Sequence, residues 1–364
     1  MTTSLSRRAF RRPAALLFAA TLGAASLTAC SSSSDNADGG SDAGADKETI
    51  QVVASTSIWA DVAQAVVNTA QTDVNIDVHP IVSGNSVDPH HFEPTAADIA
   101  RANEADVIIA GGGGYDAWLY QAVKNQDQII HALPLTAHDH GDHDHGEHDH
   151  GEEHDHAHDE HGHDDHAHDE HDHEHAHEGE TVTMDEAKKI AAEHPEQVTN
   201  IDGNEHVWYD SAAIEKVATE VAALVNETNP EAKATAKPLV ERVEGLKARI
   251  EKLPQRNYAQ TEPIADYIFK YTDSTDATPE GYRKATVAEG EPTAADLAHF
   301  LEDIKQDKID LLIFNPQTET DMTKRIRAAA EDKNIPVVEI GETPPEDTNF
   351  LDYYEEVVNA LEAV

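Results

Sequence analysis

This chain contains little cysteine, few aromatic side chains and few basic residues. Its 364 residues include a single Cys, 5% aromatic residues, and 26 Lys and Arg against 71 Asp and Glu. One cysteine cannot form an intramolecular disulfide, which excludes a disulfide-stabilised fold. A net charge of −45 without a basic stripe excludes a nucleic-acid-binding surface and favours cations as partners.

The sequence also lacks an apolar run of the roughly 20 residues that a membrane-spanning helix requires. The short run Ala14–Ala25 follows four arginines, an arrangement typical of a signal peptide, which we predict over residues 1–29. This segment ends in Leu27-Thr28-Ala29-Cys30, which resembles the bacterial lipobox. The resemblance implies cleavage before Cys30, a lipid on its thiol and attachment to the extracytoplasmic face of the cell membrane. Residues 30–48 are rich in Ser, Gly and Asp and predict a flexible linker.

Histidine, by contrast, is concentrated in one tract, residues 138–178, which holds 17 of the 24 His, 17 acidic residues and no Lys or Arg. Imidazole is the commonest side-chain ligand for borderline metals such as zinc, and carboxylates lower the cost of a bound dication. The tract has too few apolar residues to offset the entropy of an ordered chain. We therefore expect a disordered metal-collecting loop, with a solvated acidic spacer as the alternative interpretation.

The tract also contains the metalloprotease pattern H-E-x-x-H, as His173-Glu174-His175-Ala176-His177. That pattern needs a helix that presents both His toward one metal inside a cleft. Here alternating His and Glu produce the match without an apolar face, and no Ser or Cys nucleophile has a supporting context. We therefore expect the protein not to be an enzyme.

Outside the tract, short β-branched runs alternate with helical patterns, which is typical of an α/β fold. Strands are expected at Ile50–Ser55, Val74–Val82, Val107–Ala110, Gln128–Ala132, Arg256–Gln260, Lys284–Val287, Leu311–Phe314 and Val337–Ile340. Helices are expected at Ile58–Thr69, Ala96–Asn103, Tyr115–Lys124, Ser211–Asn226, Glu231–Leu253, Ile264–Tyr271, Ala294–Ile304, Thr318–Glu331 and Asn349–Leu361. The predicted organisation is two lobes, residues 49–230 and 255–364, joined by a long helix within 231–254. Each lobe is expected to be a small, mainly parallel sheet with flanking helices, and Pro238 must kink the joining helix or lie in its first turn.

One hexapeptide occurs twice, because Glu93–Asp98 is repeated letter for letter as Glu291–Asp296. Thr95 is predicted to cap a helix, with Asp98 three residues later completing a capping box. Either the two copies share capping chemistry by convergence, or the two lobes are built on the same plan with a ligand cleft between them.

Seven His lie outside the tract, and two of them stand in distinctive loops. His90 belongs to the Pro-braced loop Asp88–Pro94, and His206 belongs to Asn204–Asp210, where aromatic residues follow it. A lone His is more often structural than a ligand, so neither loop by itself predicts a metal site. The other five are His79, His91, His131, His194 and His299.

Taken together, these motifs resemble the zinc and manganese substrate-binding lipoproteins of bacterial ABC uptake transporters. The resemblance runs from about Thr49 to Val364, and the His-rich tract stands where zinc-type members carry a His-rich loop. Its motifs are DPHHFEPTAADI, VIIAGGGGYDAWL, NEHVWYD, Thr261-Glu262-Pro263, IFNPQTET and VVEIGETPPE. It implies a two-lobe metal receptor that acts as a monomer and delivers its cargo to a membrane permease powered by a cytoplasmic ATPase.

The resemblance also implies a ligand set, one residue at a time. His90 matches the first His ligand of the family and His206 matches the second. Glu262 stands where zinc-type members often carry His and manganese-type members carry Glu. The fourth ligand, a carboxylate late in the chain, falls on Glu342, with Glu339 as the alternative.

Two imidazoles and two carboxylates suit a borderline dication. The His-rich tract favours Zn²⁺, while Glu262 in place of a third His leaves Mn²⁺ as the alternative cargo. A second alternative is an extracellular zinc buffer or adhesion lipoprotein. Such a protein would need only the tract and would leave the two-lobe body unexplained.

Overall fold

The computed structural model describes residues 49–71, 75–85, 89–113, 116–133 and 181–364. All of them belong to one compact unit, Asp46–Val364. The predicted signal peptide, Cys30, the linker and the His-rich tract lie outside the described residues. Within the described ranges, no helix combines the length and the apolar composition needed to cross a bilayer.

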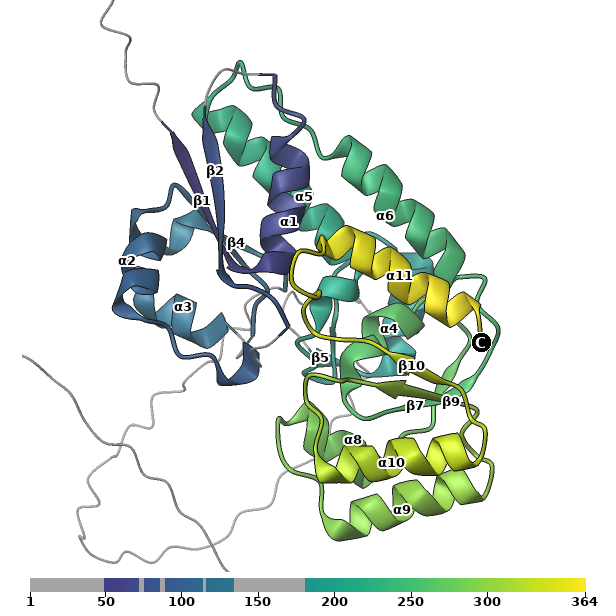
Figure 1. The fold of residues 1–364 in the computed structure, drawn as a ribbon. Coiled ribbons are helices and arrows are strands. Elements are labelled where there is room, and N and C mark those ends of the chain that lie inside the picture. The colour runs from purple at the N-terminus through teal and green to yellow at the C-terminus, as the bar shows by residue number, and fades with distance from the viewer. Residues whose placement is uncertain (1–48, 72–74, 86–88, 114–115, 134–180) are drawn as a thin grey trace, which may run out of the picture. The chain divides into compact units, whose positions relative to one another are not determined.

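The N-terminal lobe is built on a four-stranded parallel sheet in the order β2-β1-β3-β4. Figure 1 shows β1, β2 and β4 of this sheet. Its strands are β1 (Ile50–Thr56), β2 (Ile76–Val82), β3 (Val107–Ala110) and β4 (Ile129–His131). Its helices are α1 (Ser57–Val67), α2 (Ala96–Glu104), α3 (Ala117–Ala122) and α5 (Ser211–Thr228), with a 3-10 turn η3 (Gln126–Gln128) before β4. A parallel sheet covered on both faces needs apolar residues on both sides of its strands. Accordingly, Val53 packs with residues of α2 and α3, whereas its neighbour Val52 packs with residues of α1 and α5.

The C-terminal lobe repeats this construction, with parallel strands in the order β10-β9-β7-β8. The strands are β7 (Asn257–Gln260), β8 (Thr275–Asp276), β9 (Leu311–Phe314) and β10 (Val337–Glu339). The helices are α7 (Asp266–Phe269), α8 (Glu280–Val287), α9 (Ala294–Lys305), α10 (Asp321–Asp332) and α11 (Phe350–Glu362). In both lobes the spatial order of the strands, counted along the chain, is second-first-third-fourth. The two sheets therefore share one topology, and the predicted fold of two lobes with small parallel sheets is confirmed.

The repeated hexapeptide occupies the same place in both lobes, namely the connection between the second and the third strand. Thr95 caps α2 and Thr293 caps α9, and each threonine exchanges hydrogen bonds with the aspartate three residues later. The predicted capping box at Thr95 is therefore confirmed. The shared position within a shared topology favours two lobes built on the same plan over convergence.

One predicted strand is wrong, because Lys284–Val287 forms the second half of helix α8. The strand prediction rested on the β-branched residues of this segment. Helix α8 begins after Pro279 and buries Tyr282 edge-on against Phe300 of α9, so tertiary packing overrides the local propensity. The second strand of this sheet, counted along the chain, is instead the two-residue β8, which is too short to leave a periodic signal in the sequence.

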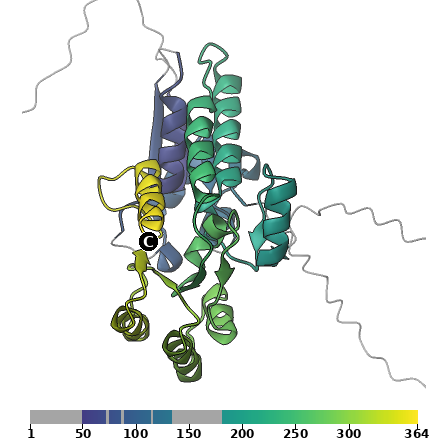
Figure 2. The ribbon, with the colours of Figure 1, turned by 90° about the vertical axis from the view of Figure 1, so that its right-hand side faces the viewer.

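Helix α6 (Lys237–Ile250) connects the two lobes and lies inside the predicted segment 231–254. Pro238 lies in its first turn. Its buried face consists of Leu239, Val243, Leu246 and Ile250. Figure 2 shows α6 alongside α5 and α1, against which it packs. Three further elements precede the 3-10 turn η4 (Val207–Tyr209) and are not predicted from the sequence: β5 (Thr181–Val182), α4 (Met184–Glu193) and β6 (Asn200–Ile201).

Candidate metal site

Four side chains that the sequence singles out lie together at the meeting point of the two lobes. One nitrogen or oxygen atom from each of His90, His206, Glu262 and Glu342 lies within 4.8 Å of every other one. This is the one such cluster of three or more His, Cys, Asp or Glu in the part of the chain that the structure describes.

Each of the four residues stands in a loop or turn beyond the end of a strand. His90 lies in the 3-10 turn η1 (Pro89–His91), and His206 directly precedes η4 (Val207–Tyr209). Glu262 lies between β7 and η5 (Pro263–Ala265), and Glu342 follows β10. In parallel α/β sheets, ligand sites form outside the carboxyl ends of the strands, so the topology itself brings these loops together.

The spacing of the donor atoms fits one small cation. His90 Nε2 lies 3.4 Å from Glu262 Oε1 and 3.5 Å from Glu342 Oε2. His206 Nε2 lies 3.6 Å from the same Glu262 Oε1. Zinc bonds of about 2.0–2.1 Å in a tetrahedron put neighbouring donors roughly 3.3 Å apart. The site is also shielded from water, since the exposed fractions of the four side chains are 11%, 6%, 13% and 0%.

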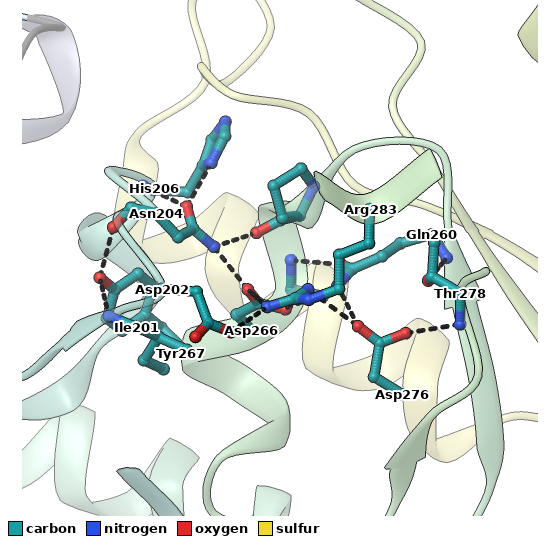
Figure 3. A network of polar contacts seen from close by, with 12 residues as sticks. Ile201, Asp202, Asn204, His206, Gln260, Asp266, Tyr267, Asp276, Thr278 and Arg283 are labelled. Atoms are coloured by element: carbon teal, nitrogen blue, oxygen red, sulfur yellow. Dashed lines mark hydrogen bonds and ion pairs between the residues drawn. The ribbon is translucent and has the colours of Figure 1, made fainter. Parts of the chain in front are cut away.

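A hydrogen-bond network behind His206 sets which ring nitrogen faces the cluster (Figure 3). The Nδ1–H group of His206 donates to Asn204 Oδ1 at 2.7 Å, and the backbone N–H of His206 donates to the same oxygen at 2.9 Å. Because that oxygen accepts both bonds, Nδ1 carries the proton and Nε2 is left as the basic nitrogen. Metal-binding histidines are commonly oriented in this way by an acceptor on the second ring nitrogen.

The network continues into the C-terminal lobe. Asn204 Nδ2 donates to Asp266 Oδ2 at 2.8 Å and to the carbonyl oxygen of Pro263. Asp266 in turn pairs with Arg283 of α8, which also contacts Asp276, as Figure 3 shows. Burial lowers the pKa of the Arg283 guanidinium, but these carboxylates outweigh burial and hold it above its ordinary value. The orientation of His206 is thus fixed by buried groups of the opposite lobe.

A second group of donors orients the two carboxylates. Asn315 Nδ2 donates to Glu262 Oε2 at 2.7 Å and to Glu342 Oε1 at 3.0 Å. Thr318 Oγ1 also donates to Glu262 Oε2, at 2.5 Å. These bonds occupy one oxygen of each carboxylate and leave the other, Glu262 Oε1 or Glu342 Oε2, facing the imidazoles.

The carboxylates of the cluster favour positive charge on the groups beside them. Burial raises the pKa of Glu262, but hydrogen bonding with His206 and His90 more than reverses this effect, so the pKa lies well below its ordinary range. Burial lowers the pKa of the His90 imidazole, but three surrounding carboxylates outweigh it and hold the pKa above the ordinary value. These carboxylates belong to Glu262, Glu289 and Glu342. A bound dication supplies the same positive charge and competes with protons for the imidazole nitrogens.

Glu342 and Glu339, the two candidates for a fourth metal ligand, lie in different surroundings. Glu342 lies in the cluster, whereas Glu339 lies on β10 with half of its side chain exposed and pairs with Arg327 Nη1 at 2.6 Å. His131 lies elsewhere and stacks on Tyr120.

The residues that sequence reasoning missed are Asn204, Asn315 and Thr318. They stand inside the motifs NEHVWYD and IFNPQTET, which indicate the family but not the hydrogen bonds of these three side chains.

The comparison with protein families matches residues 52–364 to the family described as zinc-uptake complex component A, periplasmic. The iron ABC transporter substrate-binding lipoprotein MtsA of Streptococcus pyogenes serotype M1 is 37% identical over 114 residues, 30% of this chain and 33% of that protein. The manganese ABC transporter substrate-binding lipoprotein PsaA of Streptococcus mitis is 33% identical over 113 residues, 30% of this chain and 32% of that protein. The chain thus aligns with about a third of the length of these curated relatives.

A solved structure of the protein named ZnuA shares the fold. It has a TM-score of 0.53 and 16% sequence identity, and the alignment covers 87% of this chain and 98% of that one. The family match extends over most of the sequence and includes all four clustered residues. This chain therefore belongs to the family of periplasmic component A of zinc-uptake complexes.

Proposed function

We propose that this protein is the extracytoplasmic receptor of an ABC-type uptake system and binds Zn²⁺ through His90, His206, Glu262 and Glu342. The single observation that carries the proposal is the convergence of two imidazoles and two carboxylates, two from each lobe, on one point with the spacing of a cation's ligands. Membership of a zinc-uptake family supports it. The loaded receptor then delivers the ion to a membrane permease powered by a cytoplasmic ATPase.

Zinc is the preferred cargo for two reasons. Neutral imidazole suits zinc, and the affinity order of divalent ions places zinc above manganese at almost any site of this kind. The second reason is the tract of residues 138–178, whose 17 His would serve a zinc receptor as a collector. Two glutamates favour manganese, which remains the alternative cargo. Of the two relatives described above, MtsA is named for iron and PsaA for manganese.

The remaining parts of the proposal concern the whole chain. Residues 1–29 are removed as a signal peptide, and a lipid on Cys30 anchors the protein to the membrane through the linker 30–48. Residues 49–230 and 255–364 form the two lobes and 231–254 the linking segment. We propose that the receptor acts as a monomer and performs no chemistry on its cargo.

Calorimetry tests the binding site. We compare the wild-type protein, a variant without residues 138–178, and His206→Ala in that shortened protein. The shortened protein should keep one tight Zn²⁺ site per chain, and His206→Ala should lose it while the fold remains. The exposed His194 provides a matched control, since His194→Ala should leave the site intact.

Two outcomes would redirect the proposal. If removal of residues 138–178 abolishes all tight binding, the protein is a zinc buffer or adhesion lipoprotein that depends on the tract. If His206→Ala in the shortened protein retains an unchanged tight site, the four-residue assignment is wrong.

A further inference from the structure

The two copies of the repeated segment meet at the metal site. His90 lies three residues before the first copy of the hexapeptide, and Glu289 lies two residues before the second. Glu289 Oε1 lies 3.5 Å from His90 Nδ1, on the side of the ring opposite to Glu262 and Glu342. The equivalent connections of the two lobes thus touch through one imidazole and one carboxylate.

The backbone conformation of Glu289 is unusual for its residue type. Helix α8 ends in two hydrogen bonds, from the Glu289 N–H to the Thr286 carbonyl at 3.0 Å and from the Gly290 N–H to the Ala285 carbonyl at 2.8 Å. This is the Schellman pattern, in which the residue at the position of Glu289 adopts a left-handed conformation and is usually glycine. Glu289 has φ of +53° there, although glycine would adopt this conformation without strain.

Among the described residues, six that are not glycine have positive φ. Four are Asp or Asn, whose short polar side chains tolerate this region. The two long side chains are Glu289 and Lys233, which has φ of +50° in the segment between α5 and α6. Backbone strain that persists at a ligand site points to a use for the side chain. For Glu289 the available use is the contact with His90.

The contact between Glu289 and His90 matters because of how a histidine binds a metal ion. When Nε2 of His90 binds a metal ion, Nδ1 carries the proton and requires an acceptor. For His206 the acceptor is Asn204. We propose that Glu289 is the corresponding positioning residue for His90, which holds this imidazole in its metal-binding orientation from the opposite lobe and slows release of the ion. This inference rests on the proposed metal-binding function.

The surroundings of Glu289 agree with a role at the mouth of the site. Its side chain is 52% exposed, whereas that of His90 is 11% exposed. Both line a cavity of about 350 Å³ together with Glu262, Glu291 and Glu319. Glu289 is therefore placed where a leaving cation passes from the buried ligands toward water.

The test uses the full-length protein with one equivalent of Zn²⁺, whose transfer to a chelator is followed in time. Glu289→Gly removes the carboxylate and the backbone strain together. Loss of such an orienting partner typically costs 10–100-fold in metal affinity. We expect Glu289→Gly to release zinc about 10–100-fold faster, while the melting temperature of the metal-free protein stays equal or rises. Glu289→Gln keeps a carbonyl acceptor and should show a smaller change.

Lys233→Gly is the matched control. It relieves a similar backbone strain at a residue whose side chain is exposed and lies against Glu231 rather than the site. It should release zinc at the wild-type rate. As a second readout, the visible absorption spectrum of the Co²⁺ complex should change in Glu289→Gly and not in Lys233→Gly.

The outcomes separate this inference from the proposed function. If the wild-type protein has no tight site, the proposed function fails. If the wild-type protein binds tightly and Glu289→Gly has the wild-type release rate and Co²⁺ spectrum, only the role of Glu289 is wrong. Should Glu289→Gly fail to fold, the same two measurements on Glu289→Gln decide, and wild-type values for both overturn the inference.

Discussion

At the scale of single residues, Asn315 connects the two carboxylates of the site. Its amide group is fully buried and donates to both Glu262 and Glu342. Asn315→Ala should leave two buried acceptors without this donor, which we expect to lower the free energy of unfolding by about 1–3 kcal/mol. Zinc affinity should fall as well, by about 10–100-fold, because the carboxylates lose their orientation. Urea denaturation of the metal-free protein and chelator competition measure the two effects separately, and an unchanged affinity would contradict the orienting role.

Asp116 is a second residue whose substitution has a testable effect, and it does not belong to the four-residue cluster. Its carboxylate is fully buried and accepts hydrogen bonds from the backbone N–H groups of Gly111 and Gly112 and from the Ser55 hydroxyl. Burial raises the pKa of Asp116, and these hydrogen bonds only partly offset the effect, so the pKa lies at about 6.

This raised pKa predicts how stability depends on pH. An unfolded aspartate has a pKa of about 3.9, so between about pH 4 and pH 6 the folded protein binds more protons than the unfolded chain. The contribution of Asp116 to the free energy of unfolding is therefore present at low pH and falls as pH rises through this window. By pH 7 about 3 kcal/mol should be lost. Asp116→Asn should gain stability relative to wild type by this order between pH 4 and pH 7 in urea denaturation, and a difference independent of pH would refute the prediction.

At the scale of secondary-structure elements, a buried ion pair joins α5 to the segment that follows α7. Lys270 Nζ lies 2.7 Å from Asp210 Oδ2, and both side chains are at most 1% exposed. Tyr271 donates to the other Asp210 oxygen at 2.6 Å, and Asp210 also caps α5. The pair thus fastens the start of a helix in one lobe to the end of a helix in the other.

Removal of the cation should therefore be costly. Lys270→Met leaves the buried Asp210 carboxylate without its partner, and we expect the free energy of unfolding to fall by about 3–5 kcal/mol. The control is Lys305→Met, which breaks an exposed pair with Glu302 and should cost at most about 1 kcal/mol. Urea denaturation of both variants at pH 7 decides, and equal losses would show that the buried pair is no more important than the exposed one.

At the scale of the whole molecule, the metal that the protein carries determines how a strain without the protein grows. A strain without this protein should grow poorly when zinc is scarce, and added zinc should restore its growth. A strain whose protein lacks only residues 138–178 should grow normally in ample zinc and slowly under strong zinc limitation. Rescue by manganese alone would identify manganese as the cargo, and equal growth at every zinc level would remove the proposed role of the tract.

The parts of the fold that were predicted correctly are those with long or continuous apolar patterns. Strands β3 and β9 lie at the predicted residues because Val-Ile-Ile-Ala and Leu-Leu-Ile-Phe are uninterrupted apolar runs. Helix α6 begins at Lys237 rather than Glu231, because Pro238 suits a first turn and not an interior one. Helix α4 was overlooked although Thr183 and Glu186 form a capping box, a signal that the sequence does contain.

The site was predictable only in part, for a physical reason. Its four clustered residues came from motifs that resemble a family, since no local pattern indicates that His90 and Glu342 should meet. Asn315 and Thr318 stand in a loop without periodicity, and their roles depend on which carboxylates the fold brings to them. The role of Glu289 likewise follows from its conformation and from a contact between lobes.

The hydrogen bonds around residues 204–210 have a mechanical consequence. This segment precedes the linking helix in the sequence, yet Asn204 is bonded to Asp266, Tyr209 to the carbonyl of Gly341, and Lys270 to Asp210. His206 is therefore attached to the body that carries Glu262 and Glu342, and among the four clustered residues His90 alone comes from the other side. Under the proposed function, a small rocking of the N-terminal sheet would withdraw the His90 imidazole and leave His206, Glu262 and Glu342 together. The receptor would then unload through the departure of a single ligand, without pulling its halves apart.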